Sequence, residues 1–125
     1  MKEQKIVFLD DAPELRMLFK FVFETKGSYQ VFCAESVEEM MLNKDQVLDA
    51  NAIFLDIELG KDRLNGIDAF KWLQSEKFAG RCFFLTGHGQ GHPLVREALE
   101  LGTAEVLTKP MAPKFLMDLV EKPTC

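Results

Sequence analysis

Cysteine is scarce in this sequence of 125 residues, which contains only three. The number is odd and no Cys-x-x-Cys spacing occurs, so the sequence does not indicate a disulfide framework. Cys33 and Cys82 lie in or beside apolar runs, where a free thiol behaves as a small hydrophobic group. We therefore expect a reduced, cytoplasmic protein.

Long apolar runs and an excess of basic charge are also missing. The longest apolar runs, such as the one around Ile53–Leu55, are too short to cross a bilayer. The apolar stretch near the N-terminus is brief and ends in two aspartates, unlike a signal peptide. Lys and Arg number 15 against 20 Asp and Glu, a net charge of −5. This deficit argues against direct binding of nucleic acid and against a polybasic membrane contact.

The composition that remains is that of an ordinary globular protein, with 47% hydrophobic and 28% charged residues. A chain of this length fits one domain, which we expect to span residues 1–125. It is long enough to bury a core without help from disulfides or a structural metal.

Short apolar runs alternate with helical patterns along the whole chain. The runs that predict strands are Lys5–Leu9, Tyr29–Cys33, Asn51–Leu55, Arg81–Leu85 and Glu105–Leu107. Helical patterns begin at Pro13, after Ser36, near Ile67, at Leu94 and at Pro113. Five strands alternating with five helices predict an α/β fold, a doubly wound parallel sheet covered by helices on both faces.

Polar residues stand where the predicted strands end. The first strand is followed by Asp10 and Asp11, the third by Asp56, the fourth by Thr86, and Lys109 follows the fifth. In a parallel sheet these residues lie along one edge, where such folds bind ligands. Carboxylates gathered there repel one another without a cation, and oxygen ligands suit Mg²⁺. The set predicts metal-assisted transfer of a phosphoryl group to a carboxylate.

Four motifs in order resemble the receiver domain of response regulators, the phospho-accepting partners of histidine kinases. They are FLDDAPELR, NAIFLDIEL, FFLTGHG and VLTKP. No single motif is specific, but the resemblance covers essentially the whole chain. It implies a flavodoxin-like fold with strand order 2-1-3-4-5, in a stand-alone form whose output passes through a partner protein.

The resemblance also implies a phosphorylation site. Asp56 would accept the phosphoryl group. Mg²⁺ would be held by Asp10, Asp11, Asp56 and the backbone carbonyl of Glu58. Lys109 would pair with the phosphoryl oxygens.

Further residues would transmit or tune the signal. Thr86 would bind the phosphoryl group and begin the conformational change. Receivers usually carry an aromatic residue three positions before the lysine, where this chain has Val106, so the usual coupling to Thr86 is in question. Glu58 and His88 occupy positions that tune the lifetime of the phosphoryl group in the family.

The two histidines could in principle form a metal pair. His88 and His92 lie in a glycine-rich loop, with no cysteine or acidic residue nearby in the sequence. We therefore expect no metal site there.

The first helix predicts a docking surface. Leu15 and Leu18 lie near its active-site end, where receivers bind a histidine kinase or a histidine phosphotransfer protein. Met17 and Phe21 lie on the opposite side, are expected to be exposed, and could contact another partner. A downstream protein target is expected, and a homodimer is left open.

Two alternatives remain. A degenerate receiver would bind a partner without phosphorylation, and Val106 favours this reading. A small α/β enzyme is the other, but the DxDx[TV] signature of haloacid-type phosphatases and a flavodoxin-like phosphate loop are both missing after the first strand. We expect a signalling domain that catalyses only its own phosphorylation and dephosphorylation.

Overall fold

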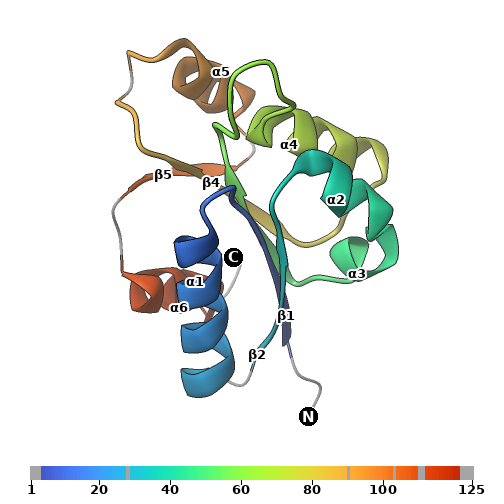
Figure 1. Ribbon diagram of the computed structural model, residues 1–125. Coiled ribbons are helices and arrows are strands. Elements are labelled where there is room, and N and C mark those ends of the chain that lie inside the picture. The colour runs from blue at the N-terminus through green and yellow to red at the C-terminus, as the bar shows by residue number, and fades with distance from the viewer. Residues whose placement is uncertain (1–3, 28, 90, 103, 110–111, 122–125) are drawn as a thin grey trace.

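The computed structural model describes residues 4–27, 29–89, 91–102, 104–109 and 112–121. Five parallel strands form one sheet in the order β2-β1-β3-β4-β5, which confirms the predicted fold class (Figure 1). The strands are β1 (Gln4–Leu9), β2 (Tyr29–Ala34), β3 (Ala52–Asp56), β4 (Arg81–Thr86) and β5 (Glu105–Thr108).

Helices cover both faces of the sheet (Figure 1). They are α1 (Pro13–Lys26), α2 (Val37–Leu42), α3 (Lys44–Leu48), α4 (Gly66–Ser75), α5 (Pro93–Leu101) and α6 (Pro113–Glu121). Helices α1 and α6 pack on one face, and the other four pack on the opposite face. No helix in the described part of the chain combines the length and the apolar character that a bilayer crossing needs.

The middle residues of the central strands are apolar because both faces of these strands are covered. Phe8, Phe54 and Phe83 occupy neighbouring positions on β1, β3 and β4. Their rings stack across the sheet, with centroids 4.9 and 5.0 Å apart, and Phe19 of α1 stacks on Phe8 at 4.6 Å. This aromatic row fixes the register of β1, β3 and β4, the three strands at whose ends Asp10, Asp56 and Thr86 stand.

The described residues form six helices, so the expectation of five was wrong. The chain turns at Asn43, whose backbone and side-chain N–H groups both donate to the carbonyl of Glu39 and close α2. The turn leaves Leu42 exposed and lets α3 bury Val47. Asparagine favours such helix ends because its short amide competes for backbone hydrogen bonds.

Candidate functional site

The register of the parallel strands brings the predicted polar residues to one edge of the sheet. Asp10 and Asp11 follow β1 directly, whereas Asp56 is the last residue of β3 and lies opposite Leu85 of β4. Thr86 ends β4. Lys109 follows β5 and donates its backbone N–H to the carbonyl of Thr86 at 2.7 Å.

Three carboxylates meet at this edge and make it the acidic edge of the sheet. Each of Asp10, Asp11 and Asp56 has a carboxylate oxygen within 4.8 Å of those of the other two. Asp10 and Asp56 are buried, with 2% and 6% of their surface exposed, and Asp11 is exposed. The set is therefore open to solvent on the side of Asp11 and closed beneath.

Lys109 bridges the two buried carboxylates. Its Nζ lies 2.9 Å from Oδ2 of Asp10 and 3.3 Å from Oδ2 of Asp56. Burial alone would lower the pKa of Lys109, but the hydrogen bond to Asp10 and the charge of Asp56 raise the pKa above its ordinary value. The amine therefore stays charged and neutralises only one of the negative charges.

Asp56 remains short of positive charge. Burial, opposed by Lys109 and assisted by the negative charge of Asp10, raises the pKa of the Asp56 carboxyl from 3.8 to about 7. Its Oδ1 accepts one weak hydrogen bond, from the backbone N–H of Glu58 at 3.3 Å. Hard oxygen ligands in this arrangement, two of them buried and under-compensated, fit the preferences of Mg²⁺.

Thr86 ends β4 at the same edge and is buried at 1% exposure. Its Oγ1 accepts a hydrogen bond from the backbone N–H of His88 at 3.0 Å. Val106 pairs with Phe84 on the neighbouring strand and packs, half-buried, against the core beneath α4 and α5. Val106 therefore lies on the same sheet face as Thr86, two residues along its strand from Thr108, which pairs with Thr86.

Two residues that support the site were not predicted from the sequence. Arg16 of α1 donates from Nη1 to the backbone carbonyl of Asp10 at 2.8 Å. Gly66 begins α4, and a Cβ there would lie 2.4 Å from the carbonyl oxygen of Asp56. Arg16 thus supports the site by a hydrogen bond to a backbone carbonyl. Gly66 supports it because a side chain at that position would collide with another backbone carbonyl.

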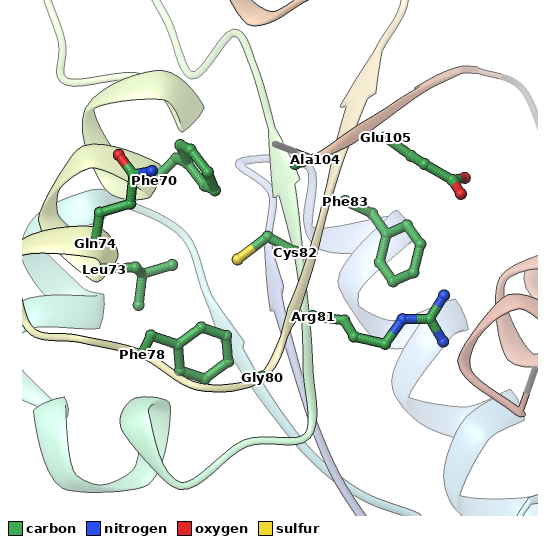
Figure 2. A pocket seen from close by; sticks show the side chains of 10 residues that line it. All are labelled: Phe70, Leu73, Gln74, Phe78, Gly80, Arg81, Cys82, Phe83, Ala104 and Glu105. Carbon is green, nitrogen blue, oxygen red and sulfur yellow. The ribbon is translucent and has the colours of Figure 1, made fainter. Parts of the chain in front are cut away.

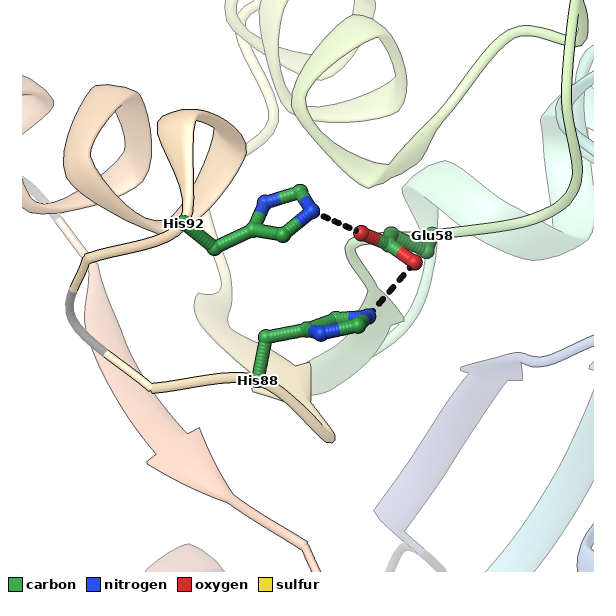
Figure 3. A group of neighbouring side chains, drawn as sticks. All are labelled: Glu58, His88 and His92. Carbon is green, nitrogen blue, oxygen red and sulfur yellow. Dashed lines mark hydrogen bonds and ion pairs between the residues drawn. The ribbon is translucent and has the colours of Figure 1, made fainter.

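The expectation that the histidines lack an acidic partner was wrong. Glu58 faces both His88 and His92 and directs one carboxylate oxygen to each, as Figure 3 shows. Glu58 lies in the loop between β3 and α4, and the histidines lie in the loop between β4 and α5. Because β3 and β4 are neighbours, the two loops meet above the same edge.

The comparison with protein families decides the assignment. The family model described as "Response regulator receiver domain" matches residues 6–121. The chain belongs to this family.

Curated relatives of the receiver agree with this assignment. It is 25% identical to the chemotaxis protein CheY of Thermotoga maritima, over 95% of this chain and 96% of the relative. It is 32% identical to the alkaline phosphatase synthesis transcriptional regulatory protein PhoP of Bacillus subtilis, over 89% of this chain and 44% of that protein. The two-component response regulator PprB of Pseudomonas aeruginosa is 28% identical, and the receiver spans 42% of it.

Solved structures match the receiver over nearly its whole length. A CheY-like receiver domain protein from Methanospirillum hungatei superimposes with a TM-score of 0.78 at 18% identity, over 96% of this chain and 92% of that one. Response regulator TrrA from Thermotoga maritima, solved in complex with Mg²⁺–BeF, has a TM-score of 0.74 at 25% identity, over 94% and 96% of the two chains. These matches establish the flavodoxin-like fold of the receiver.

The residues that the sequence predicts to dock a partner lie on α1, which begins two residues after Asp11. Leu15 is half-buried, and Leu18 is 45% exposed. Met17 and Phe21 are 72% and 64% exposed, as the sequence predicts. The helix therefore presents apolar side chains to solvent beside the acidic edge.

A hollow lies at the end of the sheet opposite the three aspartates, beside the first residues of β4 and β5 (Figure 2). It has a volume of about 410 Å³ and includes Phe70, Cys82 and Glu105. Burial raises the pKa of the Cys82 thiol to about 12, so this sulfur is unreactive. Neither group of potential metal ligands found among the described residues borders this hollow.

Proposed function

We propose that the chain accepts a phosphoryl group on Asp56 from a histidine kinase or a histidine phosphotransfer protein. The changed acidic edge then alters binding to a downstream protein. The observation that carries this proposal is the buried Asp56 carboxylate beside Asp10 and Lys109, at the carboxyl ends of the strands of a receiver sheet.

The acidic edge fits Mg²⁺, which Asp10, Asp11, Asp56 and the backbone carbonyl of Glu58 would hold. When bound, the ion supplies positive charge that favours ionised Asp56 at neutral pH and screens the phosphoryl oxygens. Asp10 and Asp56 supply buried oxygens, and Asp11 supplies one that faces solvent.

In the proposed reaction, the ionised Oδ of Asp56 attacks the phosphorus of a phosphohistidine. The new O–P bond forms as the P–N bond breaks, and the departing imidazole keeps the electron pair of that bond. Lys109, whose Nζ lies 3.3 Å from Oδ2 of Asp56, would donate hydrogen bonds to the phosphoryl oxygens as a point charge. The Thr86 hydroxyl, which already accepts from His88, keeps its own proton free to donate to a phosphoryl oxygen.

The test uses acetyl phosphate and Mg²⁺, with intact-protein mass spectrometry as the measurement. Wild-type protein should gain one phosphoryl group, and Asp56→Asn should gain none. The exposed Asp118→Asn variant on α6 is the matched control and should be modified like wild type. Equal modification of wild type and Asp56→Asn would contradict the assignment of the phosphoacceptor.

Donor docking can be separated from phosphoryl chemistry. We propose that Leu15 and Leu18 contact the helices of the phosphohistidine donor, since they lie exposed or half-exposed beside Asp11. Leu18→Glu should slow transfer from a phosphorylated donor protein and leave modification by acetyl phosphate unchanged. Leu99→Glu is the control, because Leu99 is also 45% exposed but lies on α5, which packs on the opposite face of the sheet.

A phosphorylation-independent binding module is the second candidate, because Val106 carries no ring that could follow Thr86. Partner binding should be compared with and without beryllofluoride, a mimic of the phosphoryl group. Equal affinity in both states favours the second candidate, and a change in affinity favours the first.

Under either candidate we place the chain in the cytoplasm, as a signalling domain that catalyses only its own phosphorylation and dephosphorylation. The free thiols of Cys33 and Cys82 support a reducing compartment.

A further inference from the structure

Glu58, His88 and His92 form a compact cluster above the acidic edge (Figure 3). Nε2 of His88 lies 2.7 Å from Oε2 of Glu58, and Nε2 of His92 lies 2.7 Å from Oε1. The two imidazole rings stack with centroids 4.3 Å apart. One carboxylate thus receives two imidazoles that approach from the same loop.

The ligand atoms suit a transition metal better than Mg²⁺. Two imidazole nitrogens and one carboxylate oxygen lie within 4.8 Å of one another, and the three side chains remain 32–45% exposed. Imidazole suits Zn²⁺ and its neighbours, whereas Mg²⁺ prefers oxygen ligands. Three protein ligands leave one position of a tetrahedral ion for water.

The present contacts are slightly too close for a shared ion, and the loops have room to adjust. Bonds of about 2.0–2.2 Å to a tetrahedral Zn²⁺ place its ligand atoms roughly 3.3 Å apart, so the nitrogen that faces the coordinating carboxylate oxygen must withdraw from it by about 0.6 Å. Gly87, Gly89 and Gly91 lie in the histidine loop, and a Cβ at any of them would meet no atom within 4 Å. No packed side chain at these three positions opposes the movement.

The histidine protons identify what the metal must displace. Nδ1 of His92 accepts the backbone N–H of Leu94 at 3.2 Å, so the proton of the neutral ring is on Nε2 and points at Glu58. Coordination through Nε2 moves that proton to Nδ1, so the metal bond forms as Nδ1 stops accepting from the backbone N–H of Leu94. The cluster is therefore a set of hydrogen bonds between loops that a metal ion would replace with coordinate bonds.

We propose that Glu58, His88 and His92 bind a divalent transition metal, with Zn²⁺ as the representative ion, separately from the Mg²⁺ edge. The site joins the two loops that flank the phosphoacceptor. The backbone N–H of Glu58 donates to Asp56, and that of His88 donates to Thr86, so the same two residues contact both sites.

The test titrates untagged protein with Zn²⁺ by calorimetry in millimolar Mg²⁺, which occupies the acidic edge. Cys125, outside the described residues, is replaced with Ser in every variant so that its thiol does not compete. We expect one site of micromolar or tighter affinity in the parent protein. Co²⁺ in place of Zn²⁺ should give the visible absorption of a four-coordinate nitrogen and oxygen site.

Two variants identify the ligands. His92→Asn keeps a side chain that caps α5 but cannot reach Glu58, and it should bind Zn²⁺ at least tenfold more weakly. It should still be phosphorylated on Asp56, since no described contact joins His92 to Asp56, Thr86 or Lys109. His92 meets Glu58 through the side chain and not through the backbone carbonyl expected at Mg²⁺. His88→Gln should also weaken binding, which guards against a folding defect in either variant.

Asp56→Asn provides the converse control. It should lose phosphorylation and keep the Zn²⁺ site, so failure of the metal site and failure of the phosphoacceptor assignment are separable. Absence of micromolar binding in the parent protein would overturn the proposal. Equal affinity in the parent, His92→Asn and His88→Gln would overturn it as well, because the ion would then bind elsewhere.

Discussion

Replacing Asp56 with Asn is expected to stabilise the metal-free protein at neutral and alkaline pH. The carboxyl is buried at 6% exposure, and its single bridging cation, Lys109, is shared with Asp10. Asparagine keeps the shape of the side chain and removes the negative charge. A gain in stability from the loss of a functional group is the signature of a site that stores electrostatic repulsion.

The magnitude follows from the pKa of Asp56. Folding raises the pKa from 3.8 to about 7, so the folded protein binds this proton more tightly than the unfolded chain does. The corresponding stability is fully present below pH 3.8 and is lost as the pH rises through about 7. At about 1.4 kcal/mol for each pH unit between the two values, the total is about 4 kcal/mol. Asp56→Asn should therefore gain up to about 4 kcal/mol above pH 7 and little at pH 4.

The assay is urea unfolding of both proteins from pH 4 to pH 8 in EDTA, followed by circular dichroism. The free energy of unfolding of wild type should fall relative to Asp56→Asn mainly between pH 4 and pH 7. Asp118→Asn, an exposed control, should follow wild type throughout. Added Mg²⁺ should stabilise wild type more than Asp56→Asn, which narrows the difference. An Asp56→Asn protein that is equally or less stable at pH 8 would refute the reasoning.

Three further predictions concern the support of the site. Gly66→Ala places a Cβ 2.4 Å from the carbonyl oxygen of Asp56 and should cost about 1–3 kcal/mol in urea unfolding, whereas Gly87→Ala meets no atom and should stay within about 0.5 kcal/mol of wild type. Lys109→Met removes the cation that faces the phosphoacceptor and should slow modification by acetyl phosphate at least tenfold, measured by mass spectrometry over time; an unchanged rate would contradict its role. Arg16→Ala leaves the backbone carbonyl of Asp10 without its side-chain donor and should lower the free energy of unfolding by about 1–2 kcal/mol. Arg63→Ala, at an exposed arginine, is the control, and a loss for Arg16→Ala no larger than that of the control would contradict the assignment.

The parts of the fold that depend on local pattern could be predicted from the sequence. Each strand is a short apolar run that ends in a polar residue, and this pattern identified all five strands to within a residue or so. The break at Asn43 could not be read in the same way. It depends on which of Leu42 and Val47 reaches the core, and the packing of the helices on the sheet decides that.

The acidic edge was predictable for a different reason than the cluster above it. Parallel strands place their ends together whatever the loops do, so the convergence of Asp10, Asp56 and Lys109 follows from strand order. Glu58 and His92 meet only because two loops fold toward each other. A search for ligands among sequence neighbours misses such a pair.

Contacts with the backbone left even less trace in the sequence. Arg16 binds a carbonyl, and Gly66 is required by the closeness of another carbonyl. Neither contact needs a particular residue type as its partner. No pairing of side chains in the sequence could therefore have pointed to these two positions.

The charges at the acidic edge explain why the proposed phosphoryl group would need the carboxylates, Lys109, a divalent cation and Thr86 together. Asp10, Asp11 and Asp56, when ionised, carry three negative charges against one positive charge on Lys109, and a divalent cation would balance the rest. Phosphorylation replaces the single charge of Asp56 with about two on the phosphoryl oxygens, so the edge becomes negative again. Neutral donors must then compensate, and Thr86 is the buried hydroxyl beside that position. Its movement toward the phosphoryl group would weaken the bond to His88 and so disturb the loop that meets Glu58. In this chain, where Val106 has no ring to follow Thr86, we expect that loop to carry the change from the phosphoryl group to the surface.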